Sequence, residues 1–223
     1  TCIAGGRIQD GDSVLLSFNQ ARREDITCCP SEPLYREFLR QAIRDVVEKL
    51  EPDYLHIGHD EPRFFNRCQR CRDRNLSNED LFADDIVRTH GFALEADPDL
   101  RVMIWDDAIN PYQNGPHLGT SGAAKALPRD IIVNIWWYDN EQWTEQIDQS
   151  LEYFLELGFE VTGSPWFRIP NAYHWAERLD ALKANPKALG IIYTSWEDLP
   201  NPWGALEFTA EHLWSFGKPA YTP

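Results

Sequence analysis

Short apolar runs alternate with amphipathic stretches along most of this chain, and this alternation restricts the possible folds more than any other feature. The apolar runs near residues 54, 101, 131, 159 and 190 have the length and composition of buried strands. Between them, apolar residues recur at spacings of three and four, as in helices with one buried face. We predict helices over residues 34–50, 78–96, 141–157, 171–184 and 205–216. Strands that alternate with helices form a parallel sheet covered by helices.

The number of these units separates two architectures. Five strand–helix units are clear, and a sixth strand is possible at 14–18, whereas a closed (β/α)₈ barrel needs eight. A doubly wound sheet would normally carry a glycine-rich phosphate loop after its first strand, and none is present. We therefore predict one α/β domain over residues 1–223, an incomplete TIM (β/α)₈-type barrel. Since the chain opens at Thr1 without an initiator Met or a signal region, we expect a processed or truncated piece.

Acidic and aromatic residues stand at or just past the carboxyl ends of the predicted strands. In a barrel these ends meet in one mouth, where catalytic residues lie. Carboxylates surrounded by indole rings are typical of a carbohydrate site, because the rings pack on sugar faces and the acids hold or protonate oxygens. The residues at these ends are Asp60, Glu61, Trp105, Asp106, Asp107, Trp136, Trp137, Tyr138, Trp166, Trp196 and Glu197.

Charge narrows the class of partner. With 36 acidic against 21 basic residues the net charge is -15, which disfavours nucleic acid and anionic membranes as partners. No apolar run is long enough to span a membrane. A neutral sugar fits this surface, and the nine Trp residues suit stacking on its rings. Compartment and oligomeric state stay open.

Five cysteines make an odd set for a disulfide framework. Cys68 and Cys71 have the spacing of a zinc knuckle, but structural zinc needs four ligands. The other ligands could come only from Cys2, Cys28, Cys29 or a histidine distant in sequence. We favour a disulfide or reduced thiols over a metal here.

The stretch His56-Ile-Gly-His-Asp-Glu61 resembles the His-x-Gly-Gly-Asp-Glu signature of glycoside hydrolase family 20, the β-N-acetylhexosaminidases. Pro30-Ser-Glu-Pro33, Met103-Ile-Trp-Asp-Asp107, the Trp pair at 136–137 and Thr194-Ser-Trp-Glu197 are similar to later parts of that family in order and spacing. The catalytic domain of the family is a (β/α)₈ barrel with the acidic pair after its fourth strand. The resemblance implies that two or three earlier units are missing or degraded here.

The resemblance also implies substrate-assisted hydrolysis, in which the sugar's own 2-acetamido oxygen attacks the anomeric carbon. Glu61 would be the general acid and then the base, and Asp60 would orient the acetamido group. Trp105, Trp136 or Trp137, and Trp196 would wall the sugar pocket, and Glu197 would hold outer hydroxyls. No metal or organic cofactor is required. Further candidates for substrate contact are His56, His59, Asp106, Tyr138 and Trp166.

This sequence departs from the family pattern at several positions. His59 replaces the second Gly of the signature, and the family's Tyr-Leu-Asp segment, whose Tyr bonds the acetamido oxygen, is absent. Gly163-Ser-Pro-Trp-Phe167 stands in its place, and Tyr138 is a candidate replacement for the Tyr. The family's Trp-x-Glu also lacks its spacer at Trp196-Glu197. These departures indicate a divergent branch.

Three other readings stay open. In a metal-dependent barrel hydrolase or isomerase, His56, His59, Asp60 and Asp106 would bind a divalent ion. In a two-carboxylate retaining glycosidase, Glu61 would work with Glu197. A noncatalytic sugar-binding relative is the third reading. For His56 alone, a core histidine bonded to a neighbouring backbone group is a further alternative.

Overall fold

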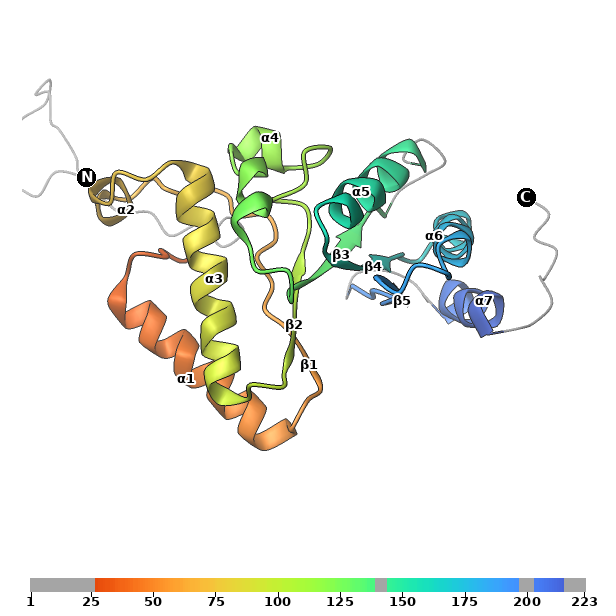
Figure 1. The fold of residues 1–223 in the computed structure, drawn as a ribbon, viewed down its shortest axis with the longest axis horizontal. Helices are drawn as coiled ribbons and strands as arrows, with labels where there is room; N and C mark the ends of the chain where they lie inside the picture. The colour runs from red at the N-terminus through yellow and green to blue at the C-terminus, as the bar shows by residue number, and fades with distance from the viewer. Residues whose placement is uncertain (1–26, 139–143, 197–202, 215–223) are drawn as a thin grey trace, which may run out of the picture.

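The computed structural model describes residues 27–138, 144–196 and 203–214 (Figure 1). The strands are β1 (Tyr54–His56), β2 (Arg101–Trp105), β3 (Ile132–Trp136), β4 (Glu160–Ser164) and β5 (Ala188–Ile191). The helices are α1 (Pro33–Leu50), α2 (Gln69–Asp73), α3 (Asn78–Ala96), α4 (Gly115–Leu118), the 3₁₀ helix η1 (Ser121–Ala126), α5 (Thr144–Glu156), α6 (Ile169–Ala181) and α7 (Trp203–Trp214).

The five strands form one parallel sheet in which each strand pairs with the next along the chain, in the order β1-β2-β3-β4-β5. Parallel neighbours joined through helices confirm the α/β prediction. No pairing joins β5 back to β1 among the described strands, so the sheet is open there. The possible strand at 14–18 lies outside the described residues, and the sixth unit is untested. Figure 1 shows the helices following the strands along one side of the sheet.

The described parts of the five long helices agree with the predicted ranges to within a few residues, and capping side chains mark the starts of α1 and α3. The side chain of Glu32 accepts a hydrogen bond from the backbone N–H of Leu34, with Pro33 as the first helical residue of α1. Ser77 accepts one from Asp80 at the start of α3. In the part of the chain that the structure describes, no helix combines the length and apolarity needed to cross a bilayer.

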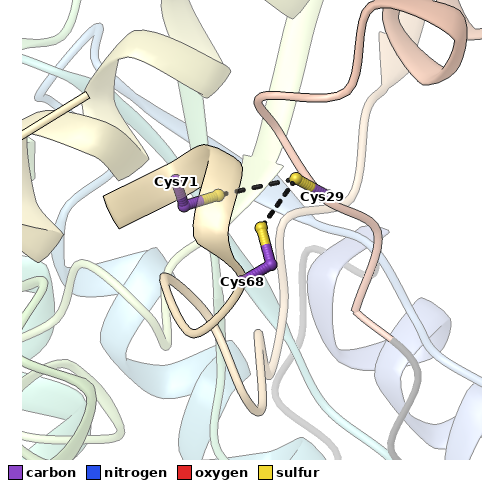
Figure 2. A group of neighbouring side chains, drawn as sticks. All are labelled: Cys29, Cys68 and Cys71. Atoms are coloured by element: carbon purple, nitrogen blue, oxygen red, sulfur yellow. Dashed lines mark hydrogen bonds between the residues drawn. The ribbon is translucent and has the colours of Figure 1, made fainter. Parts of the chain in front are cut away.

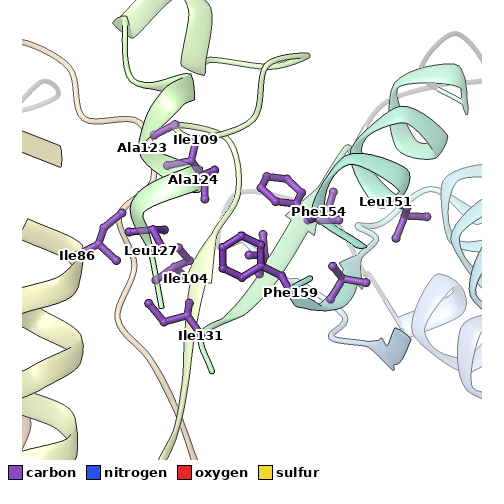
Figure 3. Close-up of a cluster of buried hydrophobic side chains, with 14 of the residues drawn as sticks. Ile86, Ile104, Ile109, Ala123, Ala124, Leu127, Ile131, Leu151, Phe154 and Phe159 are labelled. Atoms are coloured by element: carbon purple, nitrogen blue, oxygen red, sulfur yellow. The ribbon is translucent and has the colours of Figure 1, made fainter. Parts of the chain in front are cut away.

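One face of the sheet carries the main hydrophobic core. The side chains in Figure 3 converge from α3, η1, α5 and the strands, and Phe154 and Phe159 pack edge to face with ring centroids 6.2 Å apart. Toward α6 the core is closed by Trp175, which is fully buried. The Trp175 ring occupies the space above Gly163 of β4, where a Cβ would lie 2.3 Å from its Cε3. A side chain at position 163 therefore has no room.

The opposite face is polar toward its centre. Asn134 Oδ1 accepts hydrogen bonds from the hydroxyls of Thr162 and Ser164, at 3.0 and 2.7 Å. One layer lower, Arg101 is paired with Glu160 across β3. Tyr54 shares this layer and is 52% exposed. In a closed barrel this face would be the filled interior, so its exposure at β1 agrees with an incomplete barrel.

Candidate active site

The acidic pair follows β1 on a tightly turned segment. Gly58, His59 and Glu61 all have positive φ angles, of 76°, 71° and 39°. This conformation disfavours residues with a Cβ, so the surrounding structure must stabilise His59 and Glu61 in it. The hydrogen-bonded ladder ends here, where the backbone N–H of Trp105 donates to the carbonyl of Gly58. The turn directs Asp60 and Glu61 out of the sheet, and both are exposed.

Asp107, which follows β2, connects the turn after β1 to the end of β3. Its Oδ2 accepts hydrogen bonds from the backbone N–H of Glu61 at 3.0 Å and from Asn114 Nδ2 at 2.8 Å. Its Oδ1 accepts from the indole Nε1 of Trp136 at 3.3 Å. Asp107 thus fixes the backbone of Glu61 and the Trp136 indole relative to each other. We treat it as a positioning residue, one that was not among our site candidates although the sequence places it at a strand end.

Its neighbour Asp106 turns inward. Asp106 has no exposed surface, and its carboxylate accepts hydrogen bonds from the backbone N–H of Trp136 at 3.0 Å and from Asn110 Nδ2 at 2.6 Å. Burial, together with the charge of Asp107, raises the pKa of Asp106 well above its usual value. It joins β2 to β3 inside the protein, so the expectation of a direct substrate contact for Asp106 is corrected to a structural role.

Burial also raises the pKa of Asp107, to about 6. The hydrogen bonds from Asn114, Glu61 and Trp136 act in the opposite direction, but the effect of burial is larger. A carboxyl whose pKa is raised by folding stabilises the fold when protonated, and this contribution is lost as the pH rises through the folded pKa. We expect the free energy of unfolding of the wild type, measured relative to Asp107→Asn, to fall by roughly 3 kcal/mol between about pH 4 and pH 7. Urea unfolding of both proteins across this range measures it. A difference that is flat with pH would contradict the raised pKa.

The aromatic side chains expected at the strand ends gather beside the acidic pair. One cavity of about 330 Å³ is lined by Asp60, Glu61, Trp105, Trp136, Tyr138, Trp166 and Trp196. Tyr138 is central to the group: its ring stacks on Trp136 at 4.9 Å and meets Trp166 and Trp196 edge to face at 5.2 and 6.4 Å. A cavity of this size, with apolar walls and two carboxylates, accommodates a single sugar ring.

A second hollow adjoins the first at Glu61. It has a volume of about 490 Å³, and its lining includes Arg63, Phe64, Arg67 and His117 as well as Glu61. The Nη2 atom of Arg63 lies 3.3 Å from Oε2 of Glu61, and the Glu61 side chain is 46% exposed. Glu61 therefore borders both an aromatic cavity and a larger hollow with basic residues.

Two other residues that we expected to contact substrate lie elsewhere. Trp137 is in the core, where its Nε1 donates to Ser150 Oγ at 3.1 Å, since it falls on the opposite face of β3 from Trp136. His59 points toward α3, with Nε2 3.4 Å from an Asp85 carboxylate oxygen, because its left-handed backbone turns the ring away from the aromatic cavity. These two expectations are corrected. Glu197 lies outside the described residues.

His56 lies behind the cavity wall. Its ring is 4.5 Å from the Trp105 ring, and its Nδ1 accepts a hydrogen bond from the backbone N–H of Gly58. Burial, with the nearby His59, lowers the pKa of His56 to about 4, so the imidazole is neutral near pH 7. It supports Trp105 and the turn, which matches the alternative reading of a core histidine bonded to backbone.

The divalent-ion alternative lacks its ligand set. Of its four residues, Asp106 is enclosed between β2 and β3, His59 faces Asp85, and His56 holds Gly58. Within residues 27–138, 144–196 and 203–214, the cluster that could hold a metal consists of three cysteines instead. The four residues are not among the described groups whose ligand atoms lie close enough together to share an ion.

A parallel strand–helix sheet with paired carboxylates and indoles at its carboxyl edge is the arrangement of barrel-type carbohydrate-active proteins. The family model of the glycosyl hydrolase family 20 catalytic domain matches residues 8–157. The chain belongs to this family, whose catalytic domains are TIM barrels. Its described strands form an open sheet of five parallel strands, which agrees with part of such a barrel. No curated protein matches the sequence. Since the match ends at residue 157, β4, β5, Trp166 and Trp196 lie beyond it.

Proposed function

We propose that this protein is a glycosidase that removes terminal β-linked N-acetylhexosamine residues by substrate-assisted, retaining hydrolysis. The observation that carries the proposal is the cavity in which Asp60 and Glu61 lie together with five aromatic side chains. The ring faces supply apolar surfaces for a sugar, and the carboxylates supply proton transfer and charge. Membership of glycosyl hydrolase family 20 supports this chemistry.

Glu61 is the proposed general acid and base. In the first step the acetamido oxygen bonds to the anomeric carbon, the glycosidic C–O bond breaks, and the Glu61 proton moves to the departing oxygen. In the second step Glu61 takes a proton from water. The water oxygen bonds to the anomeric carbon, and the bond from that carbon to the acetamido oxygen breaks. The position of Glu61 between two hollows supports this role, because the glycosidic oxygen lies between the terminal sugar and its leaving group. We assign the sugar to the aromatic cavity and the leaving group to the hollow beside Arg63 and Arg67.

Asp60 is the proposed partner of the acetamido group. Its carboxylate lines the same cavity as Glu61, and it would hold the acetamido N–H as the oxygen attacks. As the nitrogen gains positive charge during cyclisation, a neighbouring carboxylate stabilises the transition state. The chain needs no second catalytic carboxylate in this scheme, since the nucleophile belongs to the substrate.

A thiazoline mimic of the cyclic intermediate tests the mechanism directly. We expect it to inhibit competitively, and to bind at least about a hundredfold more tightly than the product N-acetylglucosamine. The matched control is the aryl β-glucoside with a 2-hydroxyl in place of the acetamido group, which should be hydrolysed at a rate near background. Comparable turnover of the two substrates, with weak thiazoline binding, would reject substrate assistance and favour two-carboxylate chemistry.

Tyr138 is the proposed replacement for the family's missing tyrosine. Burial raises the pKa of Tyr138 to about 12, so its hydroxyl stays protonated and able to donate to an acetamido oxygen. We expect Tyr138→Phe, which keeps the ring stacked on Trp136, to lower kcat/KM for an aryl N-acetyl-β-glucosaminide about tenfold or more. The control is Tyr112→Phe, an exposed tyrosine outside the cavity, which should behave as wild type. Unchanged kinetics for Tyr138→Phe would remove this assignment.

A further inference from the structure

Three cysteine side chains from two separate segments meet beside α2. Cys29 precedes α1, Cys68 is the N-cap of α2, and Cys71 is in that helix. The Sγ atom of Cys29 lies 3.2 Å from that of Cys68 and 3.5 Å from that of Cys71, and all three atoms lie within 4.8 Å of one another (Figure 2). Cys28 is exposed and does not belong to this group.

The spacing of the sulfur atoms fits a shared metal ion. In a disulfide the two sulfurs are about 2 Å apart, and a disulfide uses only two of three thiols. Thiolates around a tetrahedral zinc ion, each about 2.3 Å from the metal, are roughly 3.7 Å apart. The Cys-x-x-Cys spacing at the start of a helix places two of these sulfurs on one side, and Cys29 supplies a third ligand. The sequence alone could not select Cys29 among its alternatives.

The surroundings hold the two segments together without an ion. Ser31 Oγ donates to Cys71 Sγ at 3.3 Å, and Arg70 forms an ion pair with Glu32 at 2.6 Å. Cys71 is 1% exposed, whereas Cys68 is open to solvent. The cluster is thus closed on its protein side and open on the side where a fourth ligand could approach.

We propose that Cys29, Cys68 and Cys71 bind one Zn²⁺ ion as thiolates, with a fourth ligand from outside this trio, and that the ion is structural. Binding releases the three thiol protons to solvent. The ion connects the segment before α1 to the loop that carries the acidic pair. A second contact joins the same parts, because Thr27 Oγ1 donates to the carbonyl of Arg63, two residues after Glu61.

Cobalt substitution gives a direct test on the full chain, purified under reducing conditions. We expect Co²⁺ to bind one to one, with thiolate charge-transfer absorption and the intense visible bands of tetrahedral cobalt, and Zn²⁺ to displace it. Cys68→Ser and Cys29→Ser should each lower Zn²⁺ affinity at least about a hundredfold. Cys28→Ser is the matched control, since it removes a thiol next to Cys29 in sequence, and it should bind as wild type.

Several results would overturn the site. One is a wild-type chain whose thiols are free but which gives no cobalt spectrum. Another is a stable disulfide at Cys29 in place of the metal, seen by intact mass spectrometry as a chain lighter by two hydrogens. An equal loss of affinity in Cys28→Ser would show that the ligand set is wrong. The wild-type and Cys28→Ser spectra decide the matter even if the Cys68→Ser and Cys29→Ser chains fail to fold. Metal content is measured without substrate, so this test is independent of the proposed hydrolysis.

Discussion

Replacing Glu61 by Gln is expected to lower kcat/KM for an aryl N-acetyl-β-glucosaminide by at least about a hundredfold, the usual scale of general acid catalysis. Gln has nearly the same size but cannot transfer a proton to the departing oxygen. The backbone N–H of residue 61 still donates to Asp107, so the turn should keep its shape. Steady-state kinetics together with circular dichroism of both proteins measure this effect.

The leaving group makes this test specific for acid catalysis. The dinitrophenolate of a dinitrophenyl glycoside leaves without being protonated. The decrease in the rate of the first chemical step in Glu61→Gln should therefore be much smaller for that substrate. Glu95→Gln is the matched control, because Glu95 is an exposed residue of α3 that pairs with Arg40 outside the cavity. If Glu61→Gln retains near-normal turnover, the assignment of Glu61 as acid fails.

The largest expected loss of stability comes from Gly163→Ala. The added Cβ would lie 2.3 Å from Cε3 and 2.7 Å from Cζ3 of Trp175, an indole that is fully buried and whose Nε1 donates to the carbonyl of Trp137 at 3.3 Å. Neither the strand nor the ring can move without disturbing this packing. We expect a loss of about 3 kcal/mol in the free energy of unfolding, at the upper end of the usual cost of overpacking a core.

Gly91→Ala is the control for this change. Gly91 lies within α3, and a Cβ there would meet no heavy atom within 4 Å. The same substitution should therefore stabilise the protein by about 0.5–1 kcal/mol, because Ala favours the helix. Urea unfolding of the three proteins separates the two effects. A Gly163→Ala protein as stable as wild type would show that the packing around Trp175 is looser than described.

Much of the fold could be predicted from the sequence because the strands are short, apolar and bounded by charged helices. The long helices α1 and α3 follow from apolar residues at spacings of three and four, and their predicted bounds differ from the structure by at most one residue. The agreement is poorer for the last strand, which the sequence predicts at 190–195 and which is Ala188–Ile191 in the structure. Its flanking Gly and polar residues give no clear boundary.

The candidate site was predicted in outline but not in side-chain direction. Carboxyl ends of parallel strands meet at one edge, so the gathering of Trp105, Trp136 and Trp196 follows from topology. Alternation along β3 and the residue after it places Trp136 on the face of Asn134 and Trp137 on the opposite face, so the sequence pattern itself distinguishes the two indoles. The inward turn of His59 depends on a positive φ angle, which no sequence pattern at a non-glycine residue indicates.

The strand order has a consequence for how the chain folds. Every described strand hydrogen-bonds to its neighbour in the sequence, so each pairing requires closure of only the segment between two consecutive strands. During synthesis, a strand from β2 onward finds its first partner already made, and the sheet can grow one unit at a time. Contacts between distant parts of the chain are then late events. Hydrogen exchange on ribosome-bound nascent chains would show such growth as protection that appears in β1–β2 before it appears in β4–β5.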